Sequence, residues 1–255
     1  MQTKAPRRGI KAAVFDLGHK GDVAYLTLDR PEARNAIPAS GWADLAERLD
    51  DVASSDARVL IVQSNGDAFC AGADLGDMPA LQSSPEAAAG FRRDIRGALD
   101  RLRGLAVPTI ARVDGACYGA GVALAIACDI RVAGRNARFA VTPAKIGLGY
   151  PQEDVHRLVM LVGPGQAARL LFTAHSLDGV EAAEIGLAES FEPEGGADAL
   201  ALAIAGNSAG SLAMLKRAIQ LASEGCRSDA GQDRSFEALI GCDEVQRRLE
   251  ALRRK

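Results

Sequence analysis

Two short loops rich in small residues are the parts of this 255-residue sequence best suited to chemistry. The first is Cys70-Ala71-Gly72-Ala73-Asp74, and the second is Gly119-Ala120-Gly121 at the start of an apolar segment. Small residues let the backbone approach a ligand closely, and the N–H groups at a helix N-terminus have no partner within the helix. Two such sites that converge would form an oxyanion hole, in which each donor typically contributes roughly 3 kcal/mol to a transition state.

Each loop, taken alone, is also explained by a turn or by close packing. Neither loop is a phosphate-binding loop, because no Lys-Ser or Lys-Thr pair follows the glycines. The intervals between Gly115, Gly119 and Gly121 do not match a dinucleotide-binding fingerprint. The five cysteines and three histidines have no metal-ligand spacing, so no metal site is predicted. Cys70, Cys117 and Tyr118 lie within the loops, where they either take part in catalysis or line the walls of a site.

Alternating strands and helices are predicted to position these loops. The short apolar run Val59–Val62 is typical of a strand buried on both faces, as in parallel sheets. Repeats of strand, small-residue loop and helix predict an α/β fold with crossover connections. We predict strands at 23–28, 59–62, 107–113 and 129–133, and helices at 38–52, 85–103 and 122–128, with helices dominating from residue 152 onward. One apolar helix face is predicted over residues 158–172, formed by Leu158, Leu161, Ala168, Leu171 and Phe172, and the last stretch, 235–254, is predicted to be amphipathic. The predicted organisation is a flexible N-terminus (1–12), an α/β core (13–195) and a C-terminal helical region (196–255).

Composition excludes several classes of function. The sequence is 48% hydrophobic and 25% charged, as expected of a soluble globular protein. Its net charge of −3 gives no general attraction to nucleic acid, so RNA binding is disfavoured. No apolar run reaches the roughly 18 residues that a membrane span needs. The N-terminus does not read as a secretory signal, and the cysteines fit no disulfide framework, so a cytoplasmic location is expected.

Several motifs in this order resemble those of the crotonase superfamily, also called the enoyl-CoA hydratase/isomerase family. The resemblance runs from about residue 12 to the C-terminus. The motifs that carry it are Arg30-Pro31 with Asn35-Ala36, Ala68 to Leu75, Asp114-Gly115 to Gly121 with Cys128-Asp129, Gly163-Pro164, and Ala182 to Leu187.

The resemblance implies a spiral of repeated ββα units, with C-terminal helices that assemble the protein as a homotrimer or homohexamer. It also implies an acyl-CoA substrate and no cofactor other than the coenzyme A that the substrate carries. The backbone N–H groups of Ala73 and Ala120 would hold the thioester oxygen. The residues that the resemblance assigns to substrate binding are Ala33, Ala71, Gly72, Asp74, Leu75, Gly76, Gly119 and Gly121.

The sequence departs from the family at the residues that carry hydratase chemistry. Hydratases of the family have two glutamates at the positions of Ala123 and Pro143. Neither alanine nor proline transfers a proton, so ordinary syn-hydration is predicted to be absent. Glu153 and Asp154 are the remaining candidates for a general acid or base; alternatively, they only complement a helix N-terminus.

The predicted function is therefore an acyl-CoA enzyme that stabilises a thioester enolate. The reaction would be double-bond isomerisation, decarboxylation or an atypical hydration. The alternative is a catalytically inert scaffold that binds acyl-CoA.

Overall fold

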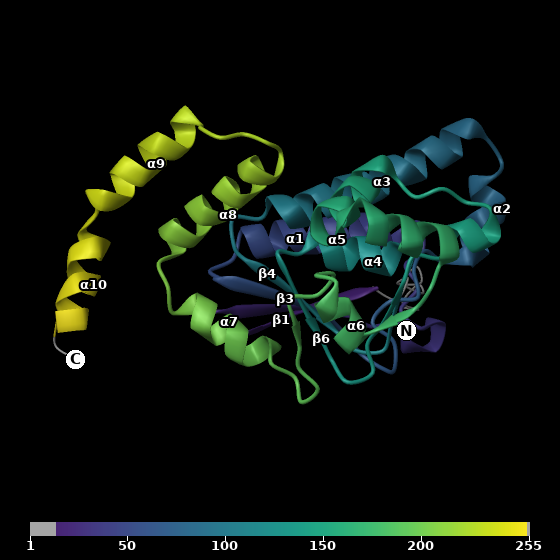
Figure 1. Cartoon of the computed structure of the whole chain (residues 1–255), viewed down its shortest axis with the longest axis horizontal. Helices are drawn as coiled ribbons and strands as arrows, with labels where there is room; N and C mark the ends of the chain where they lie inside the picture. Colours follow the sequence, from purple (N-terminus) through teal and green to yellow (C-terminus); the bar gives the residue numbers. More distant parts are fainter. Residues whose placement is uncertain (1–13, 254–255) are drawn as a thin grey trace, which may run out of the picture.

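Two β-sheets organise the structure, a computed structural model that describes residues 14–253 (Figure 1). The predicted flexible N-terminus, residues 1–12, lies outside the described residues. The larger sheet has the strand order β1-β2-β3-β4-β6-β9, and only the β1–β2 pair is antiparallel. Its strands are β1 (Phe15–Lys20), β2 (Val23–Leu28), β3 (Val59–Ser64), β4 (Thr109–Val113), β6 (Ile130–Ala133) and β9 (Ser190–Phe191).

Helices cover both faces of this sheet because its central strands are apolar on both sides. Leu60 and Val62 of β3 face one core, whereas Val59 and Ile61 face a second core. The first core lies under the helices α1 (Gly41–Ala53), α3 (Pro85–Gly104), α4 (Ala120–Ala127) and α5 (Gln152–Thr173). The second core is closed by α7 (Ala197–Ala205), which contacts β2, β3 and β4.

A smaller, three-stranded sheet positions the second small-residue loop, which directly follows its first strand. Its strands are β5 (Ala116–Tyr118), β7 (Arg138–Ala140) and β8 (Leu177–Asp178). β5 and β7 are parallel, and β8 runs antiparallel to β7. These strands have two or three residues each, too few for an apolar period to be visible in the sequence. The short helix α6 (Gly179–Glu184) follows β8 and contacts this sheet, whereas the short helix α2 (Met78–Leu81) precedes α3 and contacts it.

The predicted α/β fold with a helical C-terminal region is confirmed, and the predicted strand at 23–28 is identical to β2. The predicted apolar face on residues 158–172 is wrong in its second half. Gly163 has non-helical backbone angles (φ 74°, ψ 163°), so the face rotates at that residue. Ala167 and Leu170 are buried beyond the kink, whereas Phe172 is 82% exposed.

The C-terminal helices form an arm that begins beside the body and whose outer two helices, α9 and α10, extend away from it (Figure 1). They are α8 (Ala209–Ser223), α9 (Ala230–Ile240) and α10 (Asp243–Arg253). The amphipathic stretch predicted from residue 235 onward is divided between α9 and α10 at Gly241, which ends α9. Within residues 14–253, no single helix has the length and apolar character to cross a membrane, and the one pair that has both together, α7 with α8, is bent by 113°. Apolar side chains exposed along the arm are Leu215, Ile219, Phe236, Ile240, Leu249 and Leu252.

Candidate active site

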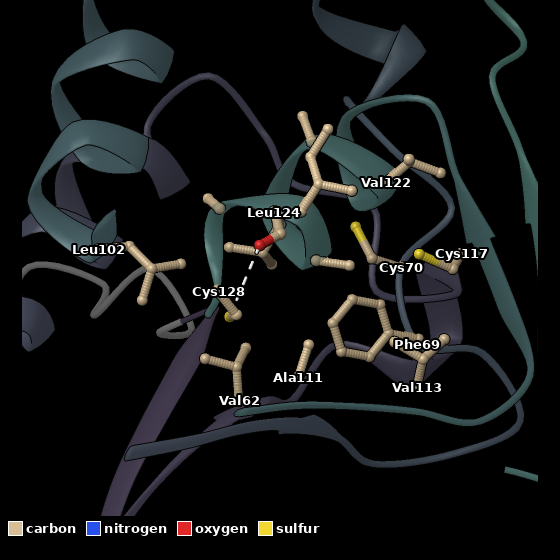
Figure 2. Close-up of a cluster of buried hydrophobic side chains, with 14 of the residues drawn as sticks. Val62, Phe69, Cys70, Leu102, Ala111, Val113, Cys117, Val122, Leu124 and Cys128 are labelled. Atoms are coloured by element: carbon tan, nitrogen blue, oxygen red, sulfur yellow. Dashed lines mark hydrogen bonds between the residues drawn. The ribbon is translucent and has the colours of Figure 1, made fainter. Parts of the chain in front are cut away.

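The two small-residue loops are joined by backbone pairing. The N–H of Cys70 donates to the carbonyl of Ala116 at 2.8 Å, and the N–H of Tyr118 donates to the carbonyl of Cys70 at 2.8 Å. This pairing forms a parallel bridge between Cys70 and Cys117. Figure 2 shows the two cysteine side chains beside Phe69 and Val122 in the buried core. The first loop, which follows β3 along the chain, is thus held directly against β5.

Glycine is required where the loops meet, because no side chain fits there. A Cβ atom on Gly121 would lie 2.9 Å from the Cβ of Cys70 and closer still to its carbonyl oxygen. A Cβ atom on Gly72 would lie 2.9 Å from the carbonyl oxygen of Tyr118 and 3.5 Å from the amide nitrogen of Ala120. Gly72 also has a φ of 108°, a backbone conformation that L side chains rarely adopt.

The same contacts bring Ala73 close to Ala120, because Ala73 directly follows Gly72 and a Cβ on Gly72 would lie 3.5 Å from the nitrogen of Ala120. The residues flanking Ala73 pair with Ile37. The N–H of Ile37 donates to the carbonyl of Gly72 at 2.8 Å, and the N–H of Asp74 donates to the carbonyl of Ile37 at 2.9 Å. In a parallel bridge, the N–H of the middle residue points away from that partner. Ala120 is the first residue of α4, so its N–H has no acceptor within the helix.

Within the described chain, neither the N–H of Ala73 nor that of Ala120 donates a hydrogen bond to another protein atom. Both residues are partly exposed. The arrangement can therefore receive an oxygen that carries negative charge, with the positive end of the α4 dipole behind one donor.

Asp74 ties the first loop to the turn at residues 30–36. Its carboxylate accepts from Arg30 at 2.6 Å and from the N–H of Gly76 at 2.9 Å. The hydrogen bond from Arg30 is the main reason that the pKa of Asp74 lies below its ordinary value. The N–H of Ala71 donates to the carbonyl of Arg34 at 3.0 Å, which brings the neighbouring Ala33 to the first loop.

The residues predicted to bind substrate come from three segments of the chain, around residues 33, 71–76 and 119–121, which the fold brings together. Leu75 is 57% exposed, and Gly76 is also exposed, at the start of a short 3₁₀ helix, Leu75–Asp77. Gly119 and Gly121 flank the donor Ala120. Their role in binding stays a prediction.

The two predicted acids occupy different surroundings at the start of α5. Glu153 is exposed, whereas Asp154 is 1% exposed. Asp154 forms ion pairs with Arg96 at 3.2 Å and with Arg157 at 3.5 Å. Burial raises the pKa of Asp154, and the two arginines oppose that shift. Asp154 therefore joins α5 to α3, and an acid–base role for either residue stays a prediction.

No ionisable group stands at the positions where hydratases carry their glutamates. Ala123 is buried in the first turn of α4, and Pro143 opens a short 3₁₀ helix, Pro143–Ile146. The thiols nearby are poor nucleophiles, because burial raises the pKa of Cys70 to about 12 and that of Cys117 well above its ordinary value. Among residues 14–253, no group of three or more His, Cys, Asp or Glu side chains could hold a metal ion.

Tyr150 is a site residue that the sequence does not single out. Its hydroxyl donates to the carbonyl of Gly119 at 3.1 Å, next to the donor Ala120. Burial is the main cause that raises the pKa of this hydroxyl well above its ordinary value. Tyr150 lies just before Pro151 and the start of α5. No spacing pattern in the sequence connects an isolated tyrosine at this position to Gly119, so the contact could not be predicted.

A cavity of about 440 Å³ lies at the opposite end of α4, between α5 and α8. Its walls are mainly apolar, and include Ile126, Leu161 and Leu212. Lys216 lines it, is 7% exposed, and pairs with Asp129 at 2.8 Å. Neither small-residue loop contributes to this cavity.

The contact at Gly121 yields a stability prediction. We expect Gly121→Ala to lower the free energy of unfolding by about 1–3 kcal/mol or more, because the added methyl group must push two backbone segments apart. Gly104→Ala is the matched control: Gly104 lies in the last turn of α3, and an added Cβ meets nothing within 4 Å. Urea denaturation at one protein concentration measures both changes. Equal stability of the two variants would contradict the described contact.

The Arg30–Asp74 pair yields a prediction about pH. The folded pKa of Asp74 lies below its unfolded value of about 3.9, so the unfolded state binds more protons in acid. The pair therefore stabilises the fold fully above that unfolded value, and this contribution is lost as the pH falls through the folded pKa. We expect wild type to exceed Asp74→Asn in unfolding free energy at pH 7, with the difference shrinking below about pH 4.

The control for the pH prediction is Asp94→Asn. Asp94 is exposed on α3 and forms no ion pair within the described chain. This variant should follow the wild-type pH dependence. A difference between wild type and Asp74→Asn that stays constant from pH 7 to pH 2 would refute the proposed linkage.

Comparisons with known proteins place the chain in one protein family. Residues 18–248 match the sequence profile of the enoyl-CoA hydratase/isomerase family. The chain is 33% identical to enoyl-CoA isomerase/hydratase fer4 of Mycosarcoma maydis, over 67% of this chain and 65% of that protein. It is 32% identical to the probable mitochondrial enoyl-CoA hydratase 2 of Arabidopsis thaliana, over 79% of this chain and 68% of that protein. The chain thus spans about two thirds of the length of these relatives.

Solved structures are similar over almost the whole chain. A putative enoyl-CoA hydratase/isomerase family protein from Hyphomonas neptunium superposes with a TM-score of 0.89 at 31% identity, covering 94% of each chain. An enoyl-CoA hydratase from Bacillus anthracis superposes with a TM-score of 0.86 at 26% identity, covering 94% of this chain and 96% of the other. The chain described here belongs to the enoyl-CoA hydratase/isomerase family, within the crotonase superfamily.

Proposed function

We propose that this protein binds an acyl-CoA thioester with its carbonyl oxygen between the N–H groups of Ala73 and Ala120. The observation that carries the proposal is the close approach of the two loops, in which a Cβ on Gly72 would lie 3.5 Å from the nitrogen of Ala120. Both N–H groups lack a protein acceptor within the described chain. Donors fixed in advance stabilise an enolate oxygen more than a neutral carbonyl oxygen, which favours reactions that pass through a thioester enolate.

Among such reactions, decarboxylation of a malonyl-type thioester fits the residues best. The bond between C2 and the carboxylate breaks, CO2 leaves, and the electron pair moves to the thioester oxygen as the enolate forms. A proton from water then adds to C2. This sequence needs no carboxylate base, and positions 123 and 143 supply none. Double-bond isomerisation needs a group that moves a proton, for which Glu153 is the exposed candidate.

A catalytically inert acyl-CoA-binding scaffold is the second candidate, and the same two positions favour it. The inert scaffold would bind acyl-CoA with the same two N–H groups but release no CO2 from a malonyl-type thioester. In either case, we propose that the apolar side chains exposed along α8, α9 and α10 pack against other copies of the chain. This fits the homotrimer or homohexamer that the family resemblance implies.

Removal of one donor tests the site directly. Proline at residue 120 replaces the amide hydrogen by a ring carbon and so removes the donor, and proline is well tolerated at the first position of a helix. We expect Ala120→Pro to slow any enolate-forming reaction by about 10²–10³-fold, because one oxyanion donor is lost. Infrared difference spectroscopy of butyryl-CoA labelled with ¹³C at its carbonyl gives a second measurement. Binding to wild type should lower the carbonyl stretching frequency of the ligand, and binding to Ala120→Pro should lower it less.

Ala209→Pro is the matched control, since Ala209 is the first residue of α8 and lies outside both loops. This control should retain the wild-type frequency and rate. An Ala120→Pro protein that is folded, binds butyryl-CoA and polarises its carbonyl as wild type does would refute the assignment of Ala120 as a donor.

Crotonyl-CoA tests the predicted loss of hydration. We expect the conjugated enoyl-thioester absorbance to persist, because each missing acid or base typically costs on the order of 10²–10⁴ in rate. An authentic hydratase under the same conditions is the positive control. Rapid formation of 3-hydroxybutyryl-CoA would contradict the prediction and would direct attention to Glu153 and Asp154. Release of CO2 from malonyl-CoA in a parallel assay would separate a decarboxylase from an inert scaffold.

A further inference from the structure

Tyr150 contacts the peptide group that carries one of the two donors. Its hydroxyl donates to the carbonyl oxygen of Gly119 at 3.1 Å. That carbonyl and the N–H of Ala120 belong to the same peptide unit. A peptide unit is planar and trans, so the C=O and N–H bonds point in opposite directions. Whatever fixes the direction of the Gly119 carbonyl therefore also fixes the direction of the Ala120 N–H.

This peptide group needs an anchor because it follows a glycine. Gly119 has φ 49° and ψ −113°, and α4 has no side-chain cap from this residue. The rotation about ψ of Gly119 sets the plane of the peptide unit that contains the Ala120 N–H. Glycine has the widest choice of backbone angles, so its own sterics restrict that plane least. The hydrogen bonds to the Gly119 carbonyl supply the restriction.

Three donors converge on that carbonyl. Two belong to α4 itself, Val122 N–H at 3.0 Å and Ala123 N–H at 3.2 Å. Tyr150 is the third, and it comes from a different element, the segment that leads into α5. The Ala123 N–H also lies within reach of the tyrosine oxygen. The hydroxyl is thus held over the first turn of α4 and connects that turn to α5.

Hydrogen bonds to a carbonyl also strengthen the N–H of the same amide as a donor, because the groups polarise one another. The surroundings of Tyr150 favour a persistent, neutral hydroxyl. Its ring packs against the main core, and burial together with the nearby Asp154 raises its pKa well above the ordinary value. The proton therefore remains on Tyr150 throughout the neutral and mildly basic range.

We propose that Tyr150 is a positioning residue that orients and polarises the Gly119–Ala120 peptide group, and so sets the strength of the oxyanion donor at Ala120. The hydroxyl acts through the backbone and does not touch the substrate. The inference rests on the proposed function, because it assigns Tyr150 to the site in which Ala73 and Ala120 bind the thioester oxygen.

The test compares Tyr150→Phe with wild type, using butyryl-CoA labelled with ¹³C at its carbonyl. In wild type, the carbonyl stretch of the bound ligand should fall below that of free butyryl-CoA. In Tyr150→Phe the fall should be smaller, with affinity for butyryl-CoA reduced by no more than about tenfold, the range of one neutral hydrogen bond. Tyr25→Phe is the matched control: it also removes a bonded hydroxyl, which donates to Asp198 at 2.7 Å, outside both loops.

A double-mutant cycle establishes that Tyr150 acts through Ala120. In the Ala120→Pro background, Tyr150→Phe should cause no further change in the carbonyl frequency. An additive change in that background overturns the proposal, and so does a wild-type frequency in Tyr150→Phe with ligand bound. If butyryl-CoA gives no bound carbonyl signal with wild type, the proposed function itself is overturned. That outcome differs from failure of the Tyr150 proposal, because wild type and every variant would then lack the signal.

Discussion

The close approach of two backbone segments, Cys70 to Gly72 and Tyr118 to Gly121, is the constraint on which the rest of this structure depends. The N–H of Tyr118 donates to the carbonyl of Cys70 at 2.8 Å, and a Cβ on Gly121 would overlap Cys70. This contact cannot tolerate a side chain at either glycine. The strands β3 and β4 must therefore end, and α4 must begin, at fixed positions relative to one another. The central strands pack apolar side chains into a core on each face of the sheet, and this packing supplies the rigidity that fixed loop positions require.

α4 is the element that transmits this constraint. Its first turn holds the Ala120 N–H and contacts the Tyr150 hydroxyl, and its body is almost wholly buried. The buried carboxylate of Asp154 connects α5 to α3 through Arg96 and Arg157. A buried ion pair stabilises little in net terms, but removal of one partner leaves an uncompensated charge. The start of α5, and with it Tyr150, is thus held in place by charge pairing rather than by apolar packing alone.

Much of the fold could be predicted because its signals are local. The strand at 23–28 and the helix over 85–104 carry clear apolar patterns, and the small-residue loops stand out at their junctions. Strands of two or three residues, such as β8, leave no detectable period. The kink at Gly163 was also beyond a periodicity argument, because the apolar residues on either side fit one helical face if the backbone is regular. The contact of Tyr150 with Gly119 joins residues far apart in sequence, and only the folded chain brings them together.

A site made of peptide groups has a consequence for how this protein can change over generations. Among single substitutions, only proline deletes an amide N–H, so almost every other codon change at residues 73 and 120 preserves both donors. The side chains at residues 123 and 143 belong to neither donor, so a substitution there removes neither N–H group. Heritable variation can therefore replace one reaction by another on this scaffold while the two proposed oxyanion donors are inherited unchanged. Under the proposed function, selection for a new activity would begin from a protein that already binds the reactive part of its substrate.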